Sequence, residues 1–167
     1  SCALSCAACF LLSMDLAIQT LNKKTGKNYS IRCYTNIDTQ YAKLVQSFNP
    51  KSLKFYSFVE ASKLDNLIEQ SCGGIIPMWP SRFDAYGTKF FSYLRSSKPF
   101  LVVQNGYEKS ELFELLHENS AVVFSDYKVP NIVEGMVHVM NSPGDPLAPL
   151  KQTLSSKNVS EKIKGII

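Results

Sequence analysis

Apolar positions along the chain alternate between helical and extended spacing. Four apolar residues with the i, i+3, i+4, i+7 spacing of a helix come first: Met14, Ala17, Ile18 and Leu21. Gly26 is a stop signal, so this helix is predicted to end near residue 25. A second helix is predicted before Asn49-Pro50 from another apolar stripe: Ile37, Tyr41, Leu44, Val45 and Phe48.

Five short segments have the composition of strands, and predicted helices separate them. They are YSIRCYT (29–35), SLKFYSF (52–58), GGIIPM (73–78), PFLVV (99–103) and AVVFS (121–125). GGIIPM is apolar throughout, as in a parallel strand covered on both faces. Ser57 and Glu60 have the spacing of a capping box for the helix that follows the second strand. The later helices are predicted to run from the 82–94 region to about Ser97, from about Lys109 to Leu116, and from Ile132 to Met140.

The strict alternation of strand and helix predicts an α/β fold. Right-handed crossovers then give a single doubly wound parallel sheet, Rossmann-like, flanked by helices on both faces. A length of 167 residues fits one domain, residues 1–167. The first strand of the pattern is expected to be cut short, and Ser1 in place of methionine indicates a trimmed chain.

Composition and charge exclude several classes of protein. The chain is 45% hydrophobic and 19% charged, with a net charge of +4 and no run of five like charges. A weakly basic tail is interpreted as a solvated face rather than a nucleic-acid site; its lysines are Lys151, Lys157, Lys162 and Lys164. No apolar stretch approaches the roughly 20 residues of a membrane span. The apolar N-terminus lacks a basic leader and is not predicted to be a signal peptide.

The cysteines and histidines do not predict a metal site. The five cysteines are Cys2, Cys6, Cys9, Cys33 and Cys72, an odd number that argues against a disulfide framework. The first three resemble the cluster-binding triad of radical-SAM enzymes, but they lie at the extreme terminus, with Ala8 where that family has an aromatic residue. We therefore predict small buried thiols on a helix. His117 and His138 have no partner at metal-ligand spacing, so surface or hydrogen-bonded histidines are expected.

The loops that follow the strands are the expected ligand site. Open parallel sheets bind ligands beyond the carboxyl ends of their strands, where helix N-termini attract anions. The relevant loops are 35–38, 57–61, 78–89, 104–110 and 125–130. No G-x-G-x-x-G follows a strand, and Gly87-Thr88-Lys89 is not a P-loop because its lysine comes last. A classical dinucleotide dehydrogenase or NTPase is therefore disfavoured, although loop 78–89 still combines a glycine, a hydroxyl, a cation and the carboxylate of Asp84.

The segment IIPMWPSRFDAYGTKFFSYLRSSKPFLVV resembles a known family. It is similar to the C-terminal, nucleotide-sugar-binding domain of retaining glycosyltransferases with two Rossmann-like domains (group 1 type, GT-B fold). Asp84-Ala85-Tyr86-Gly87 stands where that family has Glu-Gly-Phe-Gly, and Ser92 falls at the second Glu, within FFSYL for the common LFEYL. SSKPFLVV corresponds to AAGKPVLA. With looser matches, the likeness extends from about Met14 to Met140.

The resemblance implies a role for each matched residue. It assigns a catalytic role to Asp84 and nucleotide-sugar-binding roles to Gly87, Thr88, Lys89, Ser92 and Val59. Asp84 would contact the donor sugar, although its side chain is one methylene shorter than Glu. Lys89 is either a phosphate counter-charge or a solvated lysine at a helix start. Ser92 cannot accept both ribose hydroxyls, so ribose binding is weaker or differently arranged.

As a whole, the resemblance implies a glycosyltransferase domain in carbohydrate biosynthesis. A sugar would pass from a nucleotide-diphosphate-sugar donor to a saccharide or lipid-linked acceptor, without a metal or further cofactor. The chain would be the C-terminal half of a larger cytoplasmic enzyme, or one at the inner face of the membrane with only peripheral contact. Alone, it is expected to bind a nucleotide weakly and to turn over nothing.

Two other interpretations remain open. DAYGTK is a solvated turn in the first, before a helix whose Phe90, Phe91 and Leu94 belong to the core. In the second, the chain is a non-catalytic α/β interaction or regulatory module, such as a degenerate transferase domain.

Overall fold

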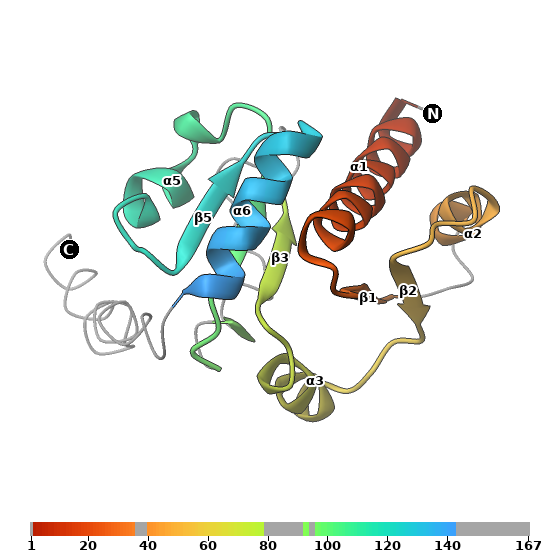
Figure 1. The fold of residues 1–167 in the computed structure, drawn as a ribbon, viewed down its shortest axis with the longest axis horizontal. Coiled ribbons are helices and arrows are strands. Elements are labelled where there is room, and N and C mark those ends of the chain that lie inside the picture. The colour runs from red at the N-terminus through yellow and green to blue at the C-terminus, as the bar shows by residue number, and fades with distance from the viewer. Residues whose placement is uncertain (1, 36–39, 79–91, 94–95, 143–167) are drawn as a thin grey trace, which may run out of the picture.

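The fold is of the α/β class, with parallel strands packed against helices (Figure 1). The computed structural model describes residues 2–35, 40–78, 92–93 and 96–142. In chain order the elements are α1 (Cys2–Thr25), β1 (Ile31–Tyr34), α2 (Gln40–Ser47), β2 (Leu53–Tyr56), α3 (Ala61–Glu69), β3 (Gly74–Pro77), β4 (Phe100–Val103), the 3-10 helix η1 (Tyr107–Lys109), α5 (Glu111–Leu116), β5 (Val122–Ser125) and α6 (Val129–Asn141). All five strands lie within the segments that the sequence predicted.

The described strands form two small parallel sheets. β1 pairs with β2, with Ile31 opposite Leu53, and β4 lies between β3 and β5, with Phe100 between Gly74 and Val122. Within the described residues β1 pairs with β2 and does not reach β3, so the strands form two sheets where the sequence predicted a single doubly wound one. On the β3 edge that faces away from β4, the Ile75 N–H donates to the Tyr93 hydroxyl instead of to a strand.

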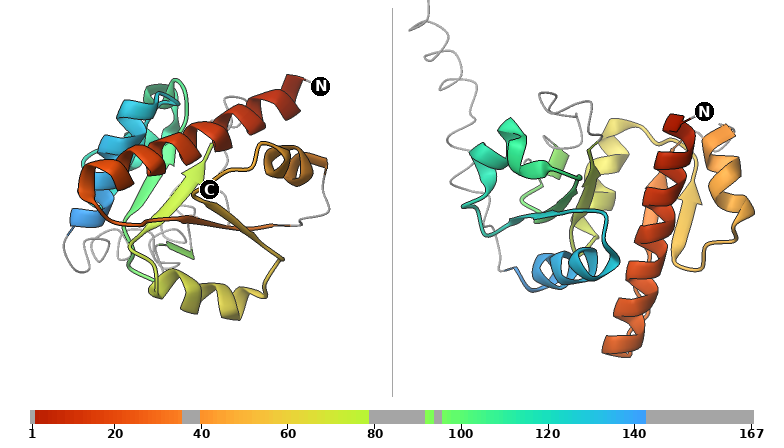
Figure 2. Two further views of the ribbon diagram at one scale, coloured as in Figure 1. Left: turned by 45° about the vertical axis from the view of Figure 1, so that its right-hand side comes forward. Right: turned by 90° about the horizontal axis from the view of Figure 1, so that it is seen from above.

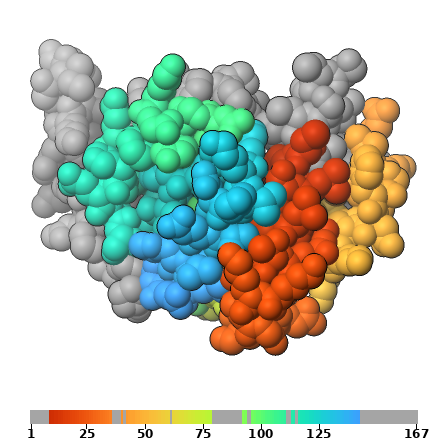
Figure 3. Space-filling model, turned by 45° about the horizontal axis from the view of Figure 1, so that its top comes forward, coloured from red at the N-terminus to blue at the C-terminus, as the bar shows by residue number. Residues whose placement is uncertain are grey.

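One face of both sheets is covered by α1, α2 and α6. α1 and α6 lie side by side in both views of Figure 2, and their side chains meet on the surface in Figure 3. A single apolar cluster joins these helices to strands of both sheets; its members include Met14, Leu21, Val45, Leu53, Leu101 and Val133. The two sheets are thus held by shared helices rather than by strand pairing.

The opposite face carries α3, α5 and the helical turn at residues 92–93. A second apolar cluster lies between α5 and the larger sheet, with Leu116 against strand residues such as Ile76 and Phe100. The Tyr93 ring stacks on Phe100, with 5.8 Å between ring centroids, and packs against Gly74. β4 has helices on both sides, and its four residues are all buried.

The helix ends agree with the sequence pattern at α1 and differ from it at α3. α1 ends at Thr25, as predicted, and Gly26 follows with a φ of 67°. The predicted capping box of Ser57 and Glu60 is wrong, since Glu60 is itself the N-cap of α3 and its side chain makes no capping hydrogen bond. α5 begins two residues after Lys109, because the Ser110 hydroxyl accepts the Phe113 N–H at 3.1 Å.

The cysteine triad lies on α1, so the prediction of a helix there is confirmed. The buried environment predicted for its thiols is wrong for Cys9, which is exposed. Cys9 is one residue, or about 100° of helix rotation, away from the buried Phe10. None of the described helices is long and apolar enough to cross a membrane.

Candidate ligand-binding edge

The carboxyl ends of β3, β4 and β5 meet at one edge of the larger sheet. Met78 N–H donates to the Val103 carbonyl at 3.1 Å, and Gln104 N–H donates to the Ser125 carbonyl at 2.9 Å. These hydrogen bonds continue the ladder one residue beyond each strand. Met78, Gln104 and Ser125 therefore lie next to one another, where a parallel sheet binds ligands.

Gln104 is the most unusual residue of this edge. Its side chain is fully buried, and within the part of the chain that the structure describes neither its amide nitrogen nor its amide oxygen has a hydrogen-bond partner. An unpaired buried polar group costs about 1–3 kcal/mol, so such a side chain is rare in a stable fold without a ligand or water. The sequence pattern predicted a ligand site that includes loop 104–110 but did not single out Gln104. The sequence feature that could have indicated it is a polar amide residue directly after the four apolar residues of β4.

Hydrogen bonds connect the loop after β5 to the residues that follow β3 and β4. The Tyr127 hydroxyl donates to the Met78 carbonyl at 3.0 Å, and the Tyr127 N–H donates to Asn105 Oδ1 at 3.1 Å. The Tyr127 ring also packs on Phe10 of α1, with centroids 5.6 Å apart. These contacts fix the three strand ends relative to one another.

The Asp126 side chain accepts hydrogen bonds from residues at the start of α6. Partial burial would raise the pKa of its carboxyl, but hydrogen bonds from the Lys128 N–H, the Lys128 ammonium and the Asn131 amide outweigh this and lower the pKa below its usual value. Oδ1 accepts the Lys128 N–H and Asn131 Nδ2, each at 2.9 Å, and Oδ2 lies 3.2 Å from Lys128 Nζ. An ionised carboxylate with its lone pairs occupied by its own loop is a poor general base.

Tyr107, in the loop after β4, packs its ring against two other aromatic side chains. Its ring lies 5.3 Å from that of Phe113 and 5.7 Å from that of Phe124. Burial raises the pKa of the Tyr107 phenol, and the negative charges of Glu108 and Asp126 add to the rise. This tyrosine therefore stays neutral and available as a hydrogen-bond donor.

Four of the six sequence-predicted site residues, Asp84, Gly87, Thr88 and Lys89, lie outside the described residues. Ser92 is half-buried in the helical turn at 92–93, and its carbonyl accepts the Ser96 N–H at 3.1 Å and the Ser96 hydroxyl at 2.8 Å. Val59 is half-buried after β2, in the smaller sheet. The roles assigned to all six remain predictions.

The described residues hold no group of three or more His, Cys, Asp or Glu side chains that could bind a metal ion. His117 and His138 are both exposed. His117 Nδ1 lies 2.9 Å from the Phe113 carbonyl oxygen, and His138 Nε2 lies 3.0 Å from that of Ser120. Both are therefore hydrogen-bonded surface histidines, as the sequence analysis expected.

No protein-family model, curated protein or solved structure matches this chain. The chemistry of the edge and the resemblance of the segment around Asp84 are therefore the basis for assigning a function.

Proposed function

We propose that the chain is the nucleotide-diphosphate-sugar-binding domain of a glycosyltransferase. In this proposal it is the C-terminal half of a two-domain enzyme, and its two sheets are halves of one doubly wound, Rossmann-like sheet. The enzyme transfers a sugar from a nucleotide donor to a saccharide or lipid-linked acceptor. Support comes from the parallel α/β fold and from the residues between Ile75 and Val103 that carry the family resemblance.

The observation that carries the proposal is the buried amide of Gln104, which has no hydrogen-bond partner among the described residues. An amide offers both a donor and an acceptor, the combination that a sugar or ribose hydroxyl needs. Met78, whose backbone pairs with β4 beside Gln104, is the last described residue before the segment that carries Asp84 and Gly87. The predicted sugar-binding segment therefore leaves the sheet at the same edge as the unpaired amide.

The chemistry of sugar transfer fits these residue types. When the glycosidic bond to the nucleotide breaks, negative charge develops on the leaving diphosphate. Backbone N–H groups at Gly87 and Thr88, together with the Lys89 ammonium, would stabilise that charge. Asp84 would orient the donor sugar through its hydroxyls. The acceptor site belongs to the other half of the enzyme, so this chain alone binds donor but does not turn it over.

A second candidate is a degenerate, non-catalytic module of the same fold. Ser92 favours it, because a serine hydroxyl cannot replace the carboxylate that accepts both ribose hydroxyls in the family. This module would use the same fold to contact a protein partner and would show no response to nucleotides.

Thermal-shift titration with UDP, GDP and their sugar conjugates distinguishes the two candidates. We expect one nucleotide series to raise the melting temperature of the wild-type chain, and Asp84→Ala, Gly87→Val and Gln104→Met to remove that rise. Gln46→Met is the matched control, because Gln46 is exposed on α2 and should leave the response intact. No response to any nucleotide would favour the interaction module, and sugar transfer by this chain alone would contradict the expected division of labour.

A further inference from the structure

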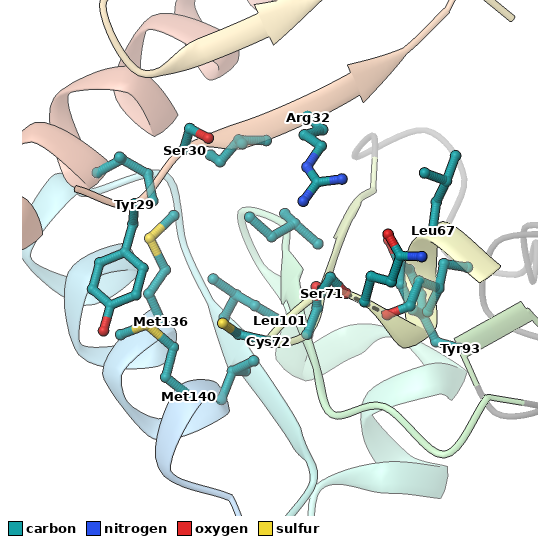
Figure 4. Close-up of a pocket in the computed structure, with 18 of the residues that line it drawn as sticks. Tyr29, Ser30, Arg32, Leu67, Ser71, Cys72, Tyr93, Leu101, Met136 and Met140 are labelled. Carbon is teal, nitrogen blue, oxygen red and sulfur yellow. Dashed lines mark hydrogen bonds between the residues drawn. The ribbon is translucent and has the colours of Figure 1, made fainter. Parts of the chain in front are cut away.

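A cavity of about 370 Å³ separates the two sheets (Figure 4). β1 and the residue before it line one side, with Ser30, Ile31, Arg32 and Tyr34, and the start of β3 lines the other, with Gly73, Gly74 and Ile75. The remaining walls are mostly apolar and come from both faces of the fold: Ile18 and Leu21 of α1, Met136 and Val139 of α6, and Leu64 and Leu67 of α3. The cavity thus passes through the layer in which the strands lie.

The edge of β1 that faces the cavity has backbone groups with no strand partner. Ile31 N–H donates to the Ser52 carbonyl, and Thr35 N–H donates to the Tyr56 carbonyl, so odd-numbered residues of this strand point toward β2. Because successive backbone groups of a strand alternate between its two edges, the N–H and C=O of Arg32 and Tyr34 point the other way. No described strand pairs with that edge.

The facing edge of β3 shows the same pattern. Gly74 and Met78 donate to β4, so the backbone groups of Gly73, Ile75 and Pro77 point toward the cavity. The Ile75 N–H is held by the Tyr93 hydroxyl, and Pro77 has no N–H to satisfy. Two strand edges of equal length, four residues each, therefore face one another across a mostly apolar space, which the Arg32 guanidinium also enters (Figure 4).

The connection through α1 defines the direction and hand of a missing element. α1 ends at the amino end of β1, so its first residues lie toward the carboxyl ends of the strands (Figure 1). A strand leading into α1 would therefore run parallel to β1 and β3. α1 and α2 pack together on one face, so a strand in the cavity would connect to β1 through α1 with the same hand as β1 connects to β2 through α2. A strand outside β2 would require the opposite, left-handed connection.

From these observations we propose that the cavity is the seat of one further parallel strand, contributed by the polypeptide immediately ahead of α1. This strand pairs with β1 on one side and β3 on the other, and it joins the two sheets into one with the order β2, β1, new strand, β3, β4, β5. Its side chains are apolar on both faces, because α1 and α6 cover one face of the cavity and α3 covers the other. It displaces the Tyr93 hydroxyl from the Ile75 N–H.

The proposal rests on the proposed function in one respect, that the chain is part of a longer polypeptide. It is tested without nucleotide, so a failure of nucleotide binding leaves it untouched. The first check is the gene: the residues that precede Ser1 should include about four consecutive apolar residues followed by a short loop. A polar or proline-rich sequence there would overturn the proposal.

Amide hydrogen exchange, followed by NMR, tests the pairing itself. The readout is the ratio of the Arg32 exchange rate to that of Cys33, whose N–H points toward β2. The ratio cancels any general change in stability between the 167-residue chain and the full polypeptide. We expect Arg32 and Tyr34 to exchange at least about 100-fold faster than Cys33 in the short chain and at a similar rate in the full polypeptide.

Tyr93→Phe provides an independent measurement. In the short chain this variant should lower the melting temperature, because the Ile75 N–H loses its acceptor. The full polypeptide should tolerate the variant, because the new strand accepts that N–H. An unchanged Arg32 to Cys33 ratio, or equal sensitivity of both forms to Tyr93→Phe, would overturn the proposal. If protection of the Arg32 amide from exchange rises with the concentration of the short chain, a second copy of the chain occupies the cavity. That result would also overturn the proposal.

Discussion

A carboxylate oxygen of Asp15, on α1, accepts the backbone N–H of Ser52 at 2.6 Å, immediately before β2. The other oxygen accepts the Lys51 N–H at 3.2 Å and the Gln19 side-chain amide at 2.6 Å. Asp15 is only 6% exposed, so these donors have little access to water. One helix side chain thereby fixes the start of the strand that pairs with β1.

Replacing Asp15 should therefore destabilise the protein. Asp15→Ala leaves two backbone N–H groups without an acceptor, and we expect it to lower the free energy of unfolding by about 3 kcal/mol. Asp15→Asn keeps one oxygen and should cost less. Urea denaturation at pH 7 measures both. Equal stabilities of the two variants and the wild type would show that water replaces the carboxylate.

Gly74 should not tolerate a side chain. A Cβ atom at this position would lie 2.1 Å from the Tyr93 ring, which cannot move freely because it stacks on Phe100. We expect Gly74→Ala to cost about 1–3 kcal/mol of unfolding free energy. In a Tyr93→Ala background the same change should cost much less, and the double-mutant cycle gives the coupling. Strict additivity of the two changes would contradict this contact.

Tyr93 should also make stability depend on alkaline pH. Burial raises the pKa of its phenol, the hydrogen bond from the Ile75 backbone partly opposes this, and the nearby Cys33 adds to the rise. Because the folded pKa lies above the unfolded value of about 10, the contribution is complete below pH 10 and is lost as the pH rises through the folded pKa. Urea midpoints between pH 8 and pH 11 should fall less steeply in Tyr93→Phe than in the wild type. Some slope should remain from Tyr107, whose pKa is raised as well.

The buried amide of Gln104 should lower the stability of the ligand-free protein. Gln104→Met keeps a similar shape and removes two buried groups without partners, so we expect the free protein to gain about 1 kcal/mol of unfolding free energy. Gln104→Glu should instead destabilise it, because a buried carboxylate without a partner is costly. Thermal denaturation without ligand measures both. A lower melting temperature for Gln104→Met would mean that the wild-type amide is hydrated.

The sequence predicted most individual elements because their signals are local. The stripe Met14, Ala17, Ile18 and Leu21 is buried on α1, and the apolar run before Gln104 is a fully buried strand. The capping-box prediction was wrong because Ser57 and Glu60 match the spacing of that motif, whereas α3 begins only after Glu60, which is itself the N-cap. Cys9 was assigned to the wrong environment because burial on a helix changes from one residue to the next.

The candidate site was only partly accessible from the sequence. A resemblance of short motifs directed attention to Asp84 and its neighbours, which lie outside the described residues. Gln104 was missed because one polar residue after an apolar run has no meaning until the burial of its amide and the positions of its neighbours are known. The hydrogen bond between Tyr127 and Met78, 49 residues apart, likewise leaves no pattern in the sequence.

The amino-acid sequence by itself determined which segments are helices and which are strands, and that the strands are parallel, because periodicity and alternation depend on near neighbours. Only the tertiary structure decided which strands pair, since pairing depends on backbone edges brought together by helices distant in sequence. It separated β1 from β3, placed a cavity between Arg32 and Ile75, and buried an amide at the carboxyl ends of the strands.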